Sequence, residues 1–394
     1  MTESAESSAG SSAGSSVPPR SSAAPAAPAA RVPGLHAVVP AGGAGTRLWP
    51  LSRAGSPKFL HDLTGAGRSL LQQTVDRLAP LAEGVVVVTG ERHAAAVIEQ
   101  LPDLRGSVLA EPSPRDSMAA IGLAAAVLAE REDDPVIGSF AADQVVEAGP
   151  AFGEAVRQAV VAARAGYVVT VGIRASGPST AFGYVRAGEP LGLPDAPDAC
   201  RAAGFTEKPD ASTAAAYLAT GEYRWNAGMF VVRASVLLDH LARLLPVLHD
   251  GLREIARAWD TDARDDVLAR VWPGLQRIAI DHAIAEPVAA EGGVAVVPGD
   301  FGWDDVGDFA SLGDLVPADD DGRHVLGDSH AVLTLDAARP VVVPGSGRLV
   351  AVLGLDDAVV VDMPDALLVT TRAHAQQVKG VVDAVRAAGR DDLV

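Results

Sequence analysis

The chain has 394 residues, 48% of them hydrophobic and only 4% aromatic, and its formal net charge is -18 at pH 7. Such an acidic chain lacks the basic face that nucleic acids and anionic membrane surfaces require, so we expect neither as a partner. Cys200 is the single cysteine, which excludes an intrachain disulfide and fits a cytoplasmic protein.

The first segment, residues 1–31, consists mostly of Ser, Ala, Pro and Gly. It has neither the basic stretch nor the apolar segment of a secretory signal. Because such a segment buries too little apolar surface to offset the entropy lost on ordering, we predict a disordered tail without chemistry. We place a large domain at residues 32–316 and a C-terminal module at residues 317–394.

From Leu35 onward, short apolar runs alternate with longer helical patterns. Continuous apolar runs are typical of strands buried on both faces, and the helices between them serve as crossovers. The pattern therefore predicts an α/β fold with a Rossmann-like, doubly wound, mostly parallel sheet. The expected strands cover residues 38–39, 85–89, 108–109, 136–140 and 167–173, and the expected helices cover 69–81, 94–101, 118–132 and 152–165.

After Gly183 the alternation becomes less regular, with one long helical region at 234–259 and a strand at 294–297. Beyond Val316 several short strands are separated by Gly, Pro and Asp turns, which predicts a small β-rich module such as a sandwich or β-roll. These strands are expected at residues 331–335, 341–343, 349–353, 358–361 and 366–370, followed by a final helix at 373–388.

The most informative motif directly follows the first predicted strand. Residues 41–50 read Ala-Gly-Gly-Ala-Gly-Thr-Arg-Leu-Trp-Pro, and Pro57-Lys58 comes shortly after. Three glycines alone would fit an ordinary turn equally well. With the rest of the string, the backbone N–H groups can hold phosphate oxygens while Arg47 and Lys58 supply positive charge. The spacing matches neither a Walker A loop nor the dinucleotide-binding fingerprint.

Two acidic residues follow later strands. Asp143 comes after the apolar strand at 136–140, and the carboxyl ends of parallel strands are where α/β sheets bind ligands. Asp305 lies in a turn after another strand. Singly, each would fit a helix cap or a solvated loop. Together they supply the one or two carboxylates that Mg²⁺ prefers.

The combination of motifs resembles the sugar-phosphate nucleotidyltransferases, and within them the mannose-1-phosphate guanylyltransferases. The likeness extends over nearly the whole chain from Leu35. Besides the glycine-rich string and Pro57-Lys58, the stretches that carry it are Glu111-Pro112-Ser113-Pro114-Arg115-Asp116, Ala141-Ala142-Asp143-Gln144, Phe182-Gly183-Tyr184, Glu207-Lys208-Pro209-Asp210, Trp225-Asn226-Ala227-Gly228-Met229-Phe230 and Trp303-Asp304-Asp305-Val306-Gly307.

The resemblance implies transfer of GMP from GTP to α-D-mannose 1-phosphate with release of pyrophosphate. It assigns Mg²⁺ to Asp143 and Asp305, and catalysis to these two with Arg47, Lys58 and Lys208. The nucleotide-binding positions are Ala41, Gly42, Gly43, Gly45, Thr46, Arg47, Lys58, Glu111 and Arg115. The sugar-phosphate-binding positions are Gly183, Glu207, Lys208, Asn226 and Gly228. The C-terminal module suggests a homodimer contact or a lid.

Two alternatives stay open. Gln144 stands where the family has His and Asp116 where Asn is common, which leaves the exact sugar undecided. The first is the same chemistry with another sugar 1-phosphate or nucleotide. The second is a catalytically silent regulatory subunit, although the charged residues of the predicted site are all present. A nicotinamide-dependent oxidoreductase is excluded, because the glycine pattern and the acidic ribose ligand are not placed as such an enzyme needs.

Overall fold

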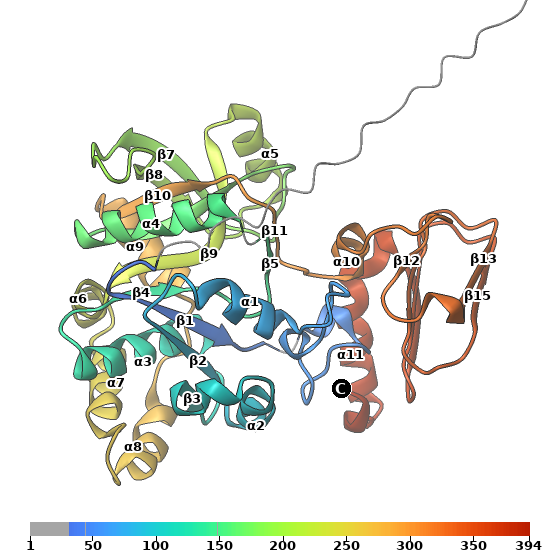
Figure 1. Ribbon diagram of the computed structural model, residues 1–394, viewed down its shortest axis with the longest axis horizontal. Helices are drawn as coiled ribbons and strands as arrows, with labels where there is room; N and C mark the ends of the chain where they lie inside the picture. Colours follow the sequence, from blue (N-terminus) through green and yellow to red (C-terminus); the bar gives the residue numbers. More distant parts are fainter. Residues whose placement is uncertain (1–30, 44, 148) are drawn as a thin grey trace, which may run out of the picture.

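The computed structural model describes residues 31–43, 45–147 and 149–394, so that the predicted tail, except for Arg31, lies outside the described residues. Figure 1 shows a large α/β body joined to a smaller β-rich module. Within the described residues, none of the helices has both the length and the apolar character needed to cross a membrane.

The body is built on a nine-stranded sheet with the order β3-β2-β1-β4-β9-β6-β10-β8-β7. Strands β8 and β9 run against the others, which makes the sheet mixed but mostly parallel. The predicted Rossmann-like α/β fold is confirmed. The strands are β1 (Leu35–Ala41), β2 (Gly84–Gly90), β3 (Val108–Glu111), β4 (Val136–Ser139), β6 (Val168–Arg174), β7 (Tyr184–Pro190), β8 (Cys200–Thr206), β9 (Tyr223–Arg233) and β10 (Val294–Gly299).

Helices cover both faces of this sheet (Figure 1). Alternate residues of β1 explain the layering, since Val38 packs into one apolar core and Val39 into the other. One core contains α3 (Asp116–Arg131), α6 (Ala234–Leu244), α7 (Pro246–Ala258), α8 (Arg264–Val271) and α9 (Glu286–Ala290), and the other contains α1 (Leu70–Leu78), α2 (Glu91–Gln100) and α4 (Pro150–Arg164).

Two helix predictions need correction. The single helix expected at residues 234–259 is divided into α6 and α7, because Pro246 lacks the N–H that would continue α6 and instead begins α7. The helix expected at 373–388 is shorter, since a 3₁₀ segment (Arg372–Gln377) precedes α11 (Val378–Ala387). Neither change moves a predicted site residue.

The predicted β-rich C-terminal module is confirmed. Of the two forms expected for it, its coil of mostly parallel strands excludes the sandwich and is closer to the β-roll. Val341 pairs in parallel with Val359, and Val332 with Val350, so each turn of the coil lies on the one before. A sandwich would instead pair sequential strands antiparallel. The strands are β12 (His324–Val325), β13 (Val332–Leu335), β14 (Val341–Pro344), β15 (Val350–Leu353), β16 (Ala358–Asp362) and β17 (Leu367–Thr371), and only β17 pairs antiparallel.

The module packs against the glycine-rich loop through one set of apolar side chains, which we call the shared cluster. Trp49 also donates a hydrogen bond from Nε1 to the carbonyl of Leu393 at 2.7 Å. The loop that follows β1 is therefore supported from behind by the C-terminal module. The buried members of the shared cluster are Leu48, Trp49, Leu51, Leu63, Leu70, Val306, Phe309, Leu312, Val316, Val341, Val343, Val359, Val361, Leu368, Ala375, Val378 and Val382.

Candidate active site

The glycine-rich loop leaves the end of β1 with an open side and a closed side. At Gly42 and Gly43, no described atom lies within 4 Å of the position that a Cβ would occupy, so a ligand can approach the backbone. At Gly45, which has a φ of 54°, a Cβ would lie 2.7 Å from Ser52 Oγ and 3.2 Å from Lys58 Cβ. Gly45 therefore allows Lys58 to pack under the loop.

Lys58 joins the two predicted metal ligands. Its ammonium group lies 3.0 Å from Asp143 Oδ2 and donates to the backbone carbonyl of Asp305 at 2.7 Å, while the residue is only 7% exposed. Burial alone would lower the pKa of Lys58, but the charges of Asp143 and Asp305 outweigh it and raise the pKa. Lys58 therefore stays positively charged at the centre of the site.

Short strands bring Asp143 and Asp305 to this lysine. Asp143 follows β4, and it precedes β5 (Val145–Val146), which pairs antiparallel with β11 (Trp303–Asp304), immediately before Asp305. Arg47 completes the group, because its Nη1 and the Asp305 Oδ2 lie 3.6 Å and 3.7 Å from the position of a Cβ at Gly307. Four residues from distant parts of the sequence thus converge at the carboxyl end of β1.

The donors in this group fit a magnesium ion. Burial raises the pKa of Asp305, even though the neighbouring Lys58 lowers it. A divalent cation beside Asp305 and Asp143 would stabilise both carboxylates in the ionised form. Asp304 has a structural role instead. Its Oδ1 accepts a hydrogen bond from the Val306 N–H at 2.7 Å, which closes the turn.

The predicted sugar-phosphate residues form a second group just before β7, just after β8 and on β9. Lys208 forms an ion pair with Glu207, whose side chain is 9% exposed. A Cβ at Gly183 would lie 2.5 Å from Glu207 Oε2 and 3.2 Å from Asn226 Cβ. Gly183 is therefore the residue that makes room for both polar side chains. Burial lowers the pKa of Lys208, but Glu207, Asp281 and Asp305 raise it overall.

Asn226 is held by a buried network that includes a residue absent from the sequence-based prediction. Its side-chain oxygen accepts from Thr170 Oγ1 at 2.6 Å and from the N–H of Gly228 at 3.1 Å, and its Nδ2 donates to Asp281 at 2.9 Å. Burial, together with the nearby Glu207, raises the pKa of Asp281 to about 6. The available signal was an aspartate within the apolar stretch 278–285.

The predicted base-side residues behave differently from each other. Glu111 ends β3, where burial raises its pKa to about 7 and leaves its Oε1 without a hydrogen-bond partner among the described residues. Arg115 instead donates to the carbonyls of Trp272, at 3.3 Å, and Pro273, at 2.7 Å. The structure thus leaves one Glu111 oxygen without a hydrogen-bond partner among the described residues and gives Arg115 protein partners.

Two glutamines also contact the site. Gln144 takes the position after Asp143, and its Nε2 donates to the carbonyl of Ala227 at 2.8 Å, which fixes β9 next to Gly228. Gln376, from the C-terminal module, accepts a hydrogen bond from Arg47 Nη1 at 3.1 Å and donates to Asp308. Gln376 was not predicted, because no motif distinguishes it in the sequence.

Comparison with known proteins identifies two family models in this chain. The model described as "Nucleotidyl transferase" matches residues 36–321, and the model described as "MannoseP isomerase/GMP-like beta-helix domain" matches residues 330–385. The second match agrees with the parallel coil of the C-terminal module.

Similar proteins cover most of the chain. Mannose-1-phosphate guanylyltransferase of Escherichia coli (strain K12) is 38% identical over 91% of this chain and 75% of its own length. Xanthan biosynthesis protein XanB of Xanthomonas campestris pv. campestris is 38% identical over 90% of this chain and 74% of its own. The crystal structure of a protein named mannose-1-phosphate geranyltransferase, from Thermus thermophilus, has a TM-score of 0.77 and 32% identity over 89% of this chain and 99% of that one. With a family model covering most of its length, this chain belongs to the nucleotidyl transferase family.

Proposed function

We propose that this nucleotidyltransferase transfers GMP from GTP to α-D-mannose 1-phosphate and releases pyrophosphate. The observation that carries the proposal is the position of Lys58, buried between Asp143 and Asp305 behind the open glycine-rich loop. The relatives named mannose-1-phosphate guanylyltransferase support the choice of substrates.

In this reaction a phosphate oxygen of mannose 1-phosphate forms a bond to the α-phosphorus of GTP. The bond from that phosphorus to the oxygen that bridges it to the β-phosphorus breaks, and pyrophosphate leaves with the electron pair. No protein nucleophile is needed, so catalysis consists of positioning the two substrates and neutralising their charge.

On the nucleotide side, the backbone of Ala41, Gly42, Gly43, Gly45 and Thr46 would hold the phosphates. Arg47 and Lys58 would offset the negative charge that develops on the departing pyrophosphate. We assign Glu111 to the guanine, because guanine presents adjacent N–H donors and the Glu111 carboxyl group has an unpartnered oxygen. Arg115 would have to leave its present carbonyl partners to reach the nucleotide.

Asp143 and Asp305 would hold Mg²⁺, which would supply charge neutralisation between the sugar phosphate and the α-phosphate. Lys208 would bind the phosphate of the sugar phosphate. Glu207 would accept hydrogen bonds from the sugar hydroxyls, and Asn226 would donate one to them from its Nδ2. The backbone at Gly183 and Gly228 would line the same pocket.

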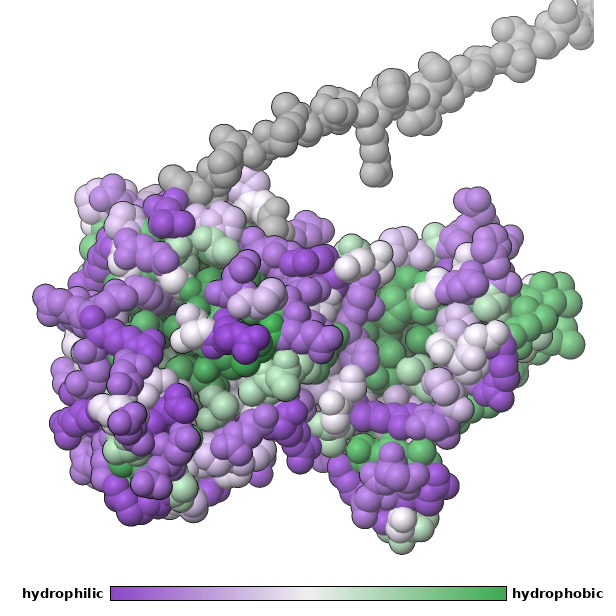
Figure 2. All heavy atoms as spheres, turned by 60° about the horizontal axis from the view of Figure 1, so that its bottom comes forward, coloured by the Kyte–Doolittle hydropathy of each residue, from purple (hydrophilic) through white to green (hydrophobic). Residues whose placement is uncertain are grey.

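We further propose that two copies of the chain associate through the C-terminal module and that the enzyme works in the cytoplasm. Figure 2 shows an apolar surface at the far end of this module. A surface of this kind on a single chain is typical of a protein–protein interface. Its exposed members, which we call the leucine face, are Leu333, Leu335, Leu349, Leu353, Leu355, Leu367 and Val369.

The test is pyrophosphate release by the purified chain with Mg²⁺, using GTP, ATP, UTP, CTP and dTTP against mannose 1-phosphate and glucose 1-phosphate. Release that is restricted to GTP and mannose 1-phosphate would support the proposal. Release with another pair would keep the chemistry and replace the substrates. Folded protein that binds nucleotide but releases no pyrophosphate with any pair would favour a silent regulatory subunit.

A further inference from the structure

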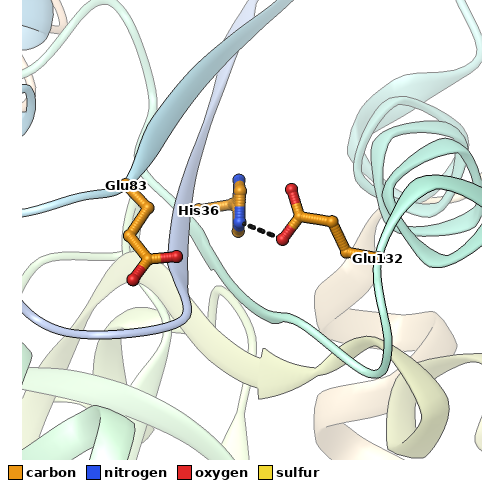
Figure 3. Close-up of side chains that lie close together, drawn as sticks. All are labelled: His36, Glu83 and Glu132. Carbon is orange, nitrogen blue, oxygen red and sulfur yellow. Dashed lines mark ion pairs between the residues drawn. The ribbon is translucent and has the colours of Figure 1, made fainter.

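A second group of potential metal ligands lies at the opposite end of β1 from the glycine-rich loop. His36 is the second residue of β1, Glu83 directly precedes β2, and Glu132 directly follows α3. One donor atom from each of the three side chains lies within 4.8 Å of the other two. Figure 3 shows the imidazole ring of His36 between the two glutamate side chains.

The backbone presents these three side chains from regular structure. His36 is the register partner of Gly84 on β2, where a Cβ would lie 3.1 Å from His36 Nδ1. A larger residue at position 84 would displace the ring. The N–H of Glu83 donates to the carbonyl of Leu35 at 2.8 Å, and that of Glu132 to the carbonyl of Leu128 at 2.9 Å. Ligands fixed on strands and helix ends are pre-organised for binding.

The imidazole is buried, and its Nε2 faces a carboxylate oxygen without forming a hydrogen bond to it. His36 is only 6% exposed. Its Nε2 lies 2.8 Å from Glu132 Oε2, but this contact lacks the geometry of a hydrogen bond, so the buried nitrogen has no hydrogen-bond partner among the described residues. Buried polar atoms normally have such a partner, so this nitrogen, which faces a carboxylate oxygen, can offer its lone pair to a cation that it shares with that oxygen.

The charges around the ring also favour a cation. Among the ion pairs of the described residues, Glu132 pairs only with His36, and Glu83 pairs with no lysine or arginine. Glu132 also follows the C-terminus of the 16-residue helix α3, where the helix dipole places partial negative charge. Two carboxylates and a helix C-terminus thus converge on one imidazole.

We propose that His36, Glu83 and Glu132 bind a transition-metal dication of the Zn²⁺ class, at a site separate from the proposed Mg²⁺ site. An imidazole nitrogen with two carboxylate oxygens suits Zn²⁺, whereas Mg²⁺ prefers oxygen ligands alone. Both glutamates are exposed, so the ion can enter from solvent and keep water as its remaining ligand. The ion would fasten the start of β1 to the start of β2 and the end of α3.

The test compares Zn²⁺ binding by the full chain and by a double variant, Glu83→Gln with Glu132→Gln. Both changes lie on the surface and keep the side-chain shape, so the variant should fold even if a change at the buried His36 would not. The matched control is Glu91→Gln with Glu99→Gln, which removes the same charge from two exposed glutamates of α2 that form no ion pair among the described residues. Zn²⁺ binding is measured by calorimetric titration after chelator treatment. Excess Mg²⁺ is present, so that the proposed Mg²⁺ site is occupied before Zn²⁺ is added.

The wild-type chain and the α2 control should each bind one more Zn²⁺ than the double variant. If all three proteins bind the same number, the Kd of the double variant should be higher by more than about tenfold, which is the change that loss of an outer-shell partner causes. Zn²⁺ should also raise the Tm of the first two proteins and not that of the double variant. Equal stoichiometry and affinity in all three proteins would overturn the proposal and leave only the contact between His36 and Glu132. This readout does not depend on which nucleotide or sugar the enzyme uses.

Discussion

Asp304 and Asp305 are neighbours in the sequence, but their side chains have different surroundings. Asp305 lies half-buried beside Lys58 and Arg47, whereas Asp304 accepts the hydrogen bond that closes its own turn. We expect Asp305→Asn to lower kcat by at least about 100-fold, the loss typical of a missing electrostatic contact in an active site. Asp304→Asn retains an acceptor oxygen and should stay within a few-fold of wild type.

Pyrophosphate release, with thermal unfolding as the control for folding, measures both variants. Asp143→Asn should behave like Asp305→Asn and keep a folded chain. Equal losses in the variants at positions 304 and 305 would contradict the assignment of the metal to Asp305.

Substitution of Glu111 should make the ligand-free chain more stable and its binding of GTP weaker. Its carboxyl pKa is raised by burial from 4.5 to about 7 in the folded chain, so the folded state holds a proton that the unfolded state has lost between these values. The free energy of unfolding should therefore decrease as the pH rises from about 4.5 to about 7. Glu111→Gln should remove this contribution and stabilise the ligand-free chain at pH 8 by about 2–3 kcal/mol.

The same substitution should raise the KM for GTP, because the amide offers the base one acceptor oxygen in place of two. Urea unfolding at pH 5 and pH 8, together with GTP kinetics, tests both halves. A variant that is stabilised but has an unchanged KM for GTP would show that Glu111 is buried for a structural reason alone.

The sequence was sufficient to identify site residues that belong to a recognisable motif. It was not sufficient to identify residues that only the tertiary fold brings to the site. Lys58 and Asp143 were predicted from motifs, and the structure brings their charged groups to 3.0 Å. Asp281 and Gln376 reach the site through hydrogen bonds to residues far away in the sequence. Gln376 has no recognisable pattern around it, and the only signal for Asp281 is its position within an apolar stretch. Their roles depend on tertiary contacts that a local pattern does not encode.

The β7–β8 hairpin leaves little space around the side chain of Glu207, and Gly183, just before β7, provides part of that space. Gly183→Ala would place a methyl group 2.5 Å from Glu207 Oε2, so Glu207 must move. We expect a KM for the sugar phosphate raised about tenfold, equivalent to about 1.4 kcal/mol, with the KM for GTP unchanged. Gly204→Ala on β8 is the matched control, since no described atom lies within 4 Å of its Cβ position.

Steady-state kinetics with each substrate varied in turn separates the two constants. If Gly183→Ala changed both KM values equally, or Gly204→Ala matched it, the hairpin would affect the fold of the site and not the sugar pocket.

Elements were predictable where the local pattern decided the structure. The apolar run of β2 and the amphipathic α4 occur close to the expected positions. The coil of the C-terminal module was not predictable, because its short strands fit a sandwich equally well and only long-range pairing, such as Val341 with Val359, distinguishes the two. The break between α6 and α7 had a local signal, Pro246, that the helical pattern on both sides concealed.

The leucine face makes a prediction about the whole molecule. Leu353 is 68% exposed at the end of the C-terminal module, far from the shared cluster. Leu353→Glu with Leu335→Glu should convert the proposed dimer to a monomer without lowering the Tm of the monomer, because neither side chain is buried in a single chain. Val247→Glu is the control, since Val247 on α7 is 73% exposed but lies outside the leucine face.

Light scattering coupled to size-exclusion chromatography measures the mass of each variant. A monomeric wild-type chain, or a double variant that keeps the wild-type mass, would exclude this face as the interface.

The shared cluster has a consequence for the order in which parts of the enzyme fold during synthesis. Leu48 and Trp49 pack with Val359, Val378 and Val382, and Trp49 donates to the carbonyl of Leu393. Contacts between residues so far apart in sequence close late, since a long loop of chain must first be ordered. During synthesis the sheet can fold while the glycine-rich loop still lacks its support. The α/β body would therefore be folded before synthesis ends. The glycine-rich loop would become fixed only later, when the C-terminal module packs against it.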